Sequence, residues 1–173
     1  MAPSTPDDAA AAAPAECCDG CGLEVAGGTR GCQLVMDELV ARDFTSIYHF
    51  RVHRMMVDTY SLQHPERYCA SAKSLAAHLT GLGWLVEHEG DRAVGSEALR
   101  HWLDGRPALE KPPIPSFRGR LTIGDVRAAE DPDAYARAVE RWARSTWEAY
   151  APLHEVAREW IRHALATGGA RRR

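Results

Sequence analysis

The chain has 173 residues, of which 45% are hydrophobic, and a formal net charge of −3. This length and composition predict one domain with an ordinary hydrophobic core. The small net charge and the interspersed acidic and basic residues argue against a surface that gathers nucleic acid or anionic lipid. No segment approaches the roughly 20 apolar residues of a membrane-spanning helix. We therefore expect a soluble protein that does not enter a membrane.

The first fifteen residues contain proline, aspartate and an alanine run. They lack the basic start and the large apolar stretch of a signal peptide, so we expect a disordered leader at 1–15 and a cytoplasmic protein. In a reducing compartment, clustered cysteines are more often metal ligands than disulfide partners. Residues 16–168 then form a single helical domain, with a basic tail at 169–173.

Hydrophobic spacing predicts an all-α fold, because apolar residues recur three and four positions apart and no strand alternation is visible. Capping signals occur at Thr122, which precedes Asp125, and at Asp131, which precedes Pro132. The segment 105–119 is too rich in proline to be regular. The sequence thus predicts a helical bundle with a cysteine-rich metal-binding loop at 16–32 and one long proline-rich connection. The expected helices cover 32–42, 46–63, 66–88, 96–103, a short turn after 122, and a long helix from 132 that Pro152 kinks.

The strongest local motif is a Cys-x-x-Cys turn formed by Cys18 and Cys21. Such a turn places two thiolates on one tetrahedral metal ion, and the glycine after it lets the backbone fold under the sulfur atoms. Cys32 is the natural third ligand, because the glycine-rich segment before it is flexible. Cys17 can replace or supplement Cys18. These donors predict a bound zinc ion, whereas Cys69 stands alone and is expected to be a packing residue.

The fourth ligand is predicted from helix geometry. If the first two helices form a hairpin that turns near Phe44, then Cys32 lies level with about Met56, at about 1.5 Å per residue. His53 is within one turn of that level, while His64 lies about 16 Å further along the helix. We therefore expect His53 to be the fourth ligand, with His64 as the alternative.

Three further polar residues, Asp58, His64 and His154, are candidates for a catalytic role if they converge on one cavity. Each also has an ordinary interpretation. Asp58 can pair with Arg54 one helical turn earlier. A histidine on an apolar helix face, such as His78 or His154, more often satisfies a core hydrogen bond than binds a metal.

These motifs together resemble the uncharacterised bacterial family called domain of unknown function 5946. The family often has Cys-Pro-x-Cys-Gly where this chain has Cys18-Asp19-Gly20-Cys21-Gly22, preceded by Cys17. The resemblance implies that His53, Asp58, His64, His78 and His154 belong to a common pattern, and it brings no established activity. It rests on 18–22, 31–32, 53–60 (His-Arg-Met-Met-Val-Asp-Thr-Tyr), 63–65 (Gln-His-Pro), 74–79, 121–126, 142–147 and His154.

Two functions follow as hypotheses. In the first, a zinc site of cysteines and histidine ties the N-terminal loop to the bundle, whose surface then serves a small molecule or a protein. In the alternative, the protein is a metal-dependent enzyme of hydrolase or thiol-transferase type, by analogy with DinB-like bundles. An open metal position would then work with Asp58, His64 or His154. Nucleic-acid binding is less favoured, because Arg30 is the only basic residue of the loop 24–31.

Overall fold

The computed structural model describes residues 14–88 and 92–169, and helices dominate both ranges. The predicted fold class, a helical bundle, is confirmed. Residues 1–13 of the expected leader and 170–173 of the expected tail lie outside the described residues. The helices are α1 (Gly28–Asp43), α2 (Ile47–Phe50), α3 (His53–Gln63), α4 (Pro65–Tyr68), α5 (Ala72–Glu87), α6 (Arg92–Asp104), α7 (Ile123–Arg127), α8 (Pro132–Ala149) and α9 (His154–Gly169), with a 3-10 turn at Ala151–Leu153.

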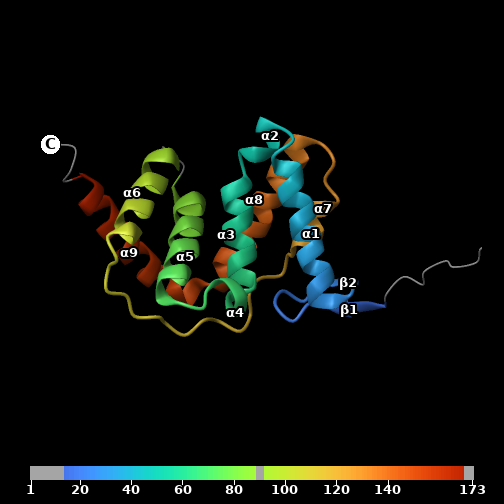
Figure 1. Ribbon diagram of the computed structural model, residues 1–173, viewed down its shortest axis with the longest axis horizontal. Helices are drawn as coiled ribbons and strands as arrows, with labels where there is room; N and C mark the ends of the chain where they lie inside the picture. Colours follow the sequence, from blue (N-terminus) through green and yellow to red (C-terminus); the bar gives the residue numbers. More distant parts are fainter. Residues whose placement is uncertain (1–13, 89–91, 170–173) are drawn as a thin grey trace, which may run out of the picture.

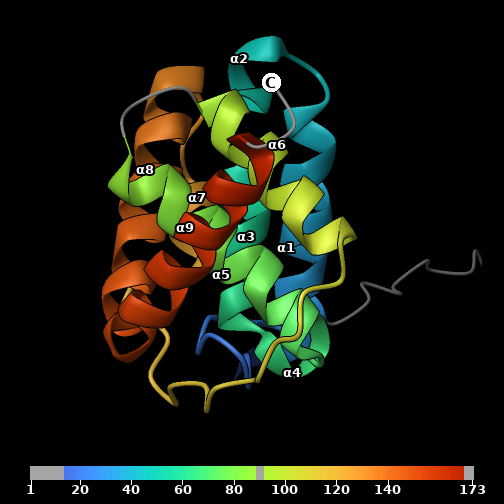
Figure 2. The same ribbon diagram turned by 90° about the vertical axis from the view of Figure 1, so that its left-hand side faces the viewer.

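The helices form two layers. In Figure 1, α6, α5, α3 and α1 stand side by side with α8 and α9 behind them, and in the view turned by 90° in Figure 2, α8 lies to the left of these helices. α8 packs against α3 and α5, α9 packs against α5 and α6, and α7 lies against α1 and α8. The core between the layers includes the fully buried side chains of Tyr135, Trp142 and Tyr150. Within the described ranges, no helix is long and apolar enough to cross a membrane.

Two short strands precede the helices, which corrects the expectation of a chain without strands. β1 (Ala15–Cys17) pairs antiparallel with β2 (Glu24–Ala26), and Ala15 lies opposite Ala26. Three residues are too few for a visible alternation of apolar and polar side chains. Regular structure thus begins inside the expected leader, where the Pro14 carbonyl also accepts a hydrogen bond from the Gly27 amide at 3.3 Å.

Both predicted capping signals begin helices. The Thr122 and Asp125 side chains cap α7 reciprocally, and the Asp131 carboxylate accepts from the amides of Asp133 and Ala134 at the start of α8. The proline-rich connection between α6 and α7 contains no helix or strand, as expected. It runs along the lower edge of the molecule in Figure 1, past α4.

Three expected helices are each divided in two. The segment 46–63 breaks at Arg51 and Val52 into α2 and α3, and 66–88 becomes α4 and α5 because Ser71 caps a new helix with Ser74. Pro152 lies in a 3-10 turn that separates α8 from α9 instead of kinking one helix. The first of these breaks matters most, because α2 occupies the turn between α1 and α3.

A buried carboxylate fixes that turn. Asp43, the last residue of α1, accepts a hydrogen bond from Nδ1 of His53, the first residue of α3, at 2.8 Å. Its other oxygen accepts from the Tyr135 hydroxyl of α8 at 2.7 Å. From this contact the two helices run on side by side. Cys32 lies eleven residues before Asp43 on α1, and His64 lies eleven residues after His53, directly after the end of α3.

We predict that Asp43→Ala lowers the free energy of unfolding by roughly 2–4 kcal/mol, because the buried Tyr135 hydroxyl and the partly buried His53 ring lose their acceptor. Urea denaturation measures this change. Asp104→Ala is the matched control, since Asp104 also ends its helix but is exposed. The control should shift stability by less than about 0.5 kcal/mol. An Asp43→Ala variant as stable as the control would contradict the role of Asp43.

Candidate metal centre

Four donor side chains meet at one end of the bundle: Cys18, Cys21, Cys32 and His64. Their ligand atoms all lie within 4.8 Å of one another. The Sγ atoms of Cys21 and Cys32 are 3.7 Å apart, and Nε2 of His64 lies 3.3 Å from Cys18 Sγ and 3.6 Å from Cys32 Sγ. All are buried except Cys21, which is half-buried. Three thiols and an imidazole in this arrangement could hold a metal ion.

The β1–β2 hairpin presents the first two cysteines in a tight turn. The Cys18 amide donates to the Leu23 carbonyl, and the Gly22 amide donates to the Cys18 carbonyl, both at 2.8 Å. Gly22 has φ 77°, a left-handed conformation that favours glycine. Gly20 is required for a different reason, because a Cβ atom there would overlap Cδ2 of His64. The hairpin can therefore pack closely against the histidine ring.

His64 is oriented by its other ring nitrogen. Nδ1 lies 2.8 Å from the backbone carbonyl of Tyr60, which can only accept, so Nδ1 carries the hydrogen. In the neutral ring, Nε2 then has its lone pair directed at the sulfur atoms. A metal-binding histidine typically has such a partner for its second nitrogen. The imidazole also stacks on the Tyr60 ring, with centroids 4.0 Å apart.

The donor side chains strongly shift one another's pKa values. Hydrogen bonding from the Cys32 thiol, aided by His64, outweighs burial and lowers the pKa of Cys21 to about 4. The same hydrogen bond, with burial, raises the pKa of Cys32. For His64, burial is the largest influence and acts downward, but hydrogen bonds with Cys21, the Tyr60 carbonyl and Cys18 together raise its pKa. Within this pair the surroundings therefore favour the thiolate at Cys21 over the thiolate at Cys32.

The fourth position departs from the sequence-based expectation. His53 binds Asp43 at the other end of α3, and His64, the alternative, lies beside the sulfur atoms. The assumed hairpin turned near Phe44, whereas α2 lengthens the actual turn and slides α3 along α1. Cys17, the alternative to Cys18, is exposed in β1 and is not part of the group.

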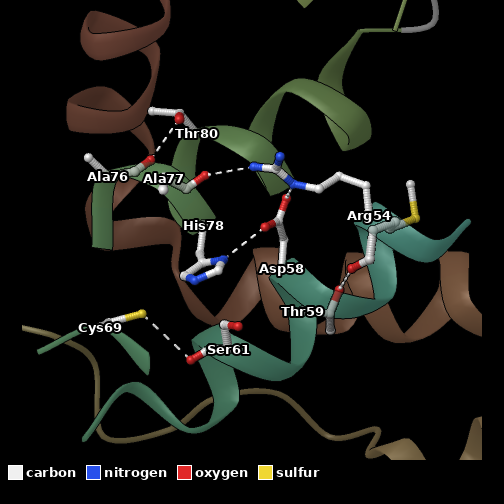
Figure 3. Close-up of polar contacts among 10 residues, drawn as sticks. Arg54, Asp58, Thr59, Ser61, Cys69, Ala76, Ala77, His78 and Thr80 are labelled. Carbon is white, nitrogen blue, oxygen red and sulfur yellow. Dashed lines mark hydrogen bonds and ion pairs between the residues drawn. The ribbon is translucent and has the colours of Figure 1, made fainter. Parts of the chain in front are cut away.

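The remaining candidates form separate contacts. Figure 3 shows the buried Asp58 carboxylate between Arg54, which donates at 2.6 Å, and Nδ1 of His78, which donates at 2.9 Å. This cluster joins α3 to α5. His154 donates through Nε2 to the Trp147 carbonyl at 2.8 Å and stacks on the Trp147 ring. Of the three proposed catalytic residues, therefore, only His64 lies with the cysteines.

Residues that surround the candidate metal centre were not predicted from the sequence. The Arg118 guanidinium donates to the carbonyls of Gly20 and Gln63, at 3.3 and 3.2 Å, and pairs with Glu66. The Gln63 side chain in turn donates to the carbonyls of Arg118 and Leu121. Gln63 belongs to the Gln-His-Pro motif, but nothing in the sequence marks Arg118. These hydrogen bonds hold the proline-rich connection against the candidate metal centre.

We predict a large difference in thiol reactivity between Cys21 and Cys69 in the metal-free protein. Burial raises the pKa of Cys69 to about 12, and its side chain is fully buried, whereas Cys21 is half-buried with a pKa of about 4. At about pH 6, iodoacetamide should therefore modify Cys21 well before Cys69. The Cys21 rate should fall as pH drops through about 4, because the thiolate gains a proton.

Mass spectrometry of digested samples measures both rates, and unfolding in urea is the control that should equalise them. Equal modification of the two thiols in the folded, metal-free protein would contradict the prediction.

Comparison with known proteins agrees with the pattern of motifs. The family of unknown function DUF5946 matches residues 16–151, which include all four donors, the hairpin apart from Ala15, and the helices through α8. No curated protein and no solved structure matches the chain. The chain belongs to the DUF5946 family.

Proposed function

We propose that the cluster binds one zinc ion in a structural site that ties the N-terminal hairpin to the bundle. The spacing of the donors supports this proposal. With Zn–S about 2.3 Å and Zn–N about 2.0–2.1 Å, a tetrahedral ion separates two sulfurs by about 3.8 Å and a sulfur from a nitrogen by about 3.5–3.6 Å. The measured separations are 3.7 Å for Cys21 to Cys32 and 3.6 and 3.3 Å from His64 to two sulfurs.

The donors come from three segments that are distant in sequence. Cys18 and Cys21 lie in the β1–β2 hairpin, Cys32 in the first turns of α1, and His64 between α3 and α4. One ion would crosslink all three. Because the hairpin has only two short strands, the ion would supply the main restraint on its position.

A structural role fits this arrangement better than the metal-dependent enzyme considered as the alternative. A catalytic zinc keeps one coordination position open, but here three cysteines and His64 supply a complete tetrahedral set. Asp58 is held between Arg54 and His78, and His154 is bound to a carbonyl. Neither residue is placed beside the donors to move a proton.

We predict that the isolated protein carries about one zinc per chain, and that His64→Ala and Cys21→Ser lose it. His53→Ala, which removes the ligand predicted from the sequence, should retain zinc, because Asp43 keeps its hydrogen bond from Tyr135 of α8. The loss in His64→Ala should exceed the roughly 10- to 100-fold drop in affinity typical of changes outside the ligand set.

Native mass spectrometry with elemental analysis gives the metal content of each variant. A folded wild type that neither carries nor takes up zinc would overturn the proposal. So would loss of zinc from His53→Ala together with its retention in His64→Ala.

We further predict that zinc removal loosens the protein locally. Hydrogen exchange should accelerate in the β1–β2 hairpin, the start of α1 and the α3–α4 junction, which the ion would hold together. Amides of α5, α6, α8 and α9 should stay protected, because their apolar contacts do not involve the site. Uniform loss of protection along the chain would contradict this prediction.

A further inference from the structure

A pocket of about 400 Å³ opens beside the metal centre. The hairpin contributes Gly20 to its wall, α1 contributes Gln33, and the α3–α4 region contributes His64 and its neighbours. The aromatic and basic side chains among those neighbours are Tyr60, Arg67 and Tyr68.

Hydrogen-bond donors are in surplus in this pocket. The Gln33 amide oxygen accepts from the Tyr68 hydroxyl at 2.7 Å, Arg67 Nη1 at 3.0 Å and the Tyr60 hydroxyl at 3.4 Å. Its amide nitrogen donates to Asp37 at 2.8 Å, which keeps the oxygen turned toward the three donors. An amide oxygen has two lone pairs, so it cannot satisfy three donors well. The pocket therefore suits a ligand that brings acceptor oxygens.

The charges of the pocket suit a single negative charge. Glu66 is paired with Arg118, and Asp19 accepts from the Thr29 hydroxyl at 3.0 Å. In the part of the chain that the structure describes, Arg67 has no carboxylate partner, and its guanidinium lies 5.3 Å from the centre of the Tyr68 ring. Arg67 is therefore a cation in the wall that can pair with an anion. The Asp19 carboxylate keeps its charge, because the Thr29 hydroxyl that binds it is neutral, and it repels a dianion such as phosphate more strongly than a monoanion.

We propose that this pocket binds a small monocarboxylate with a flat apolar body. The carboxylate accepts from Arg67 and the Tyr68 hydroxyl, because both are then relieved of sharing Gln33. The partly exposed ring of Tyr68 supplies aromatic surface for the body of the ligand, and the buried rings of Tyr60 and His64 line the pocket beside it.

Binding at this pocket rests on the proposed zinc site, because both are built from the same segments. The hairpin, α1 and the α3–α4 region each give the cluster a donor and the pocket a wall. Tyr60 connects them directly, since its hydroxyl lies 3.4 Å from Gln33 Oε1 and 3.7 Å from Cys32 Sγ. Zinc removal therefore separates the walls, and ligand binding in turn strengthens zinc binding.

The test uses benzoate as the probe and the full zinc-loaded chain, with calorimetry or NMR titration as the readout. Benzoate should bind at least about tenfold more tightly than benzamide or inorganic phosphate, as expected for a charge-assisted contact. Arg67→Gln should weaken benzoate binding by about tenfold or more and keep its zinc. Arg144→Gln, at an exposed arginine of α8, is the control and should match the wild type.

Metal content is measured on every sample, so the two proposals fail separately. A zinc-loaded wild type that does not bind benzoate, or an Arg67→Gln variant that binds it as tightly as the wild type, overturns the pocket and leaves the zinc site intact. Undiminished benzoate binding by metal-free protein overturns the coupling between the two. A wild type that binds no zinc overturns the proposed function and this inference with it.

Discussion

The hydrogen bonds that Asp43 accepts from His53 and Tyr135 determine how α1 lies against α3 and α8. The carboxylate is fully buried, so a shift along either helix would leave it without partners at a cost of several kcal/mol. Because both helices continue from this contact at about 1.5 Å per residue, Cys32 and His64 arrive side by side about 16 Å away. The contacts of Asp43 at the opposite end of α3 thus help to set the helix register that brings the donors of the candidate metal centre together.

α3 is the element on which the other polar contacts converge. His53 binds Asp43 of α1, Asp58 binds His78 of α5, and Gln63 accepts from the Trp142 indole of α8 at 3.0 Å. His64 follows directly and faces the cysteines. Each of these side chains joins α3 to a different neighbour. These contacts account for the many polar groups that this short helix carries.

The metal centre and its pocket also depend on the connection between α6 and α7. Arg118 donates to the carbonyls of Gly20 and Gln63, so the hairpin, α3 and the connection meet at one guanidinium. Its partner Glu66 lies in the pocket wall, where this ion pair cancels one negative charge. The connection thus shapes the electrostatics of the site, in addition to joining the two layers.

Spacing and local chemistry were enough to predict the helical class, the capping residues Thr122 and Asp131, and the candidate cysteine ligands. It favoured His53 over His64 as the fourth donor, whereas the structure brings His64 to the cysteines. That choice depends on helix register, which changed when α2 entered the turn and Asp43 bound His53. The surplus of donors around Gln33 arises in the same way, from segments far apart in the chain. Only tertiary packing could decide these features, because local sequence does not encode which distant side chains share a buried space.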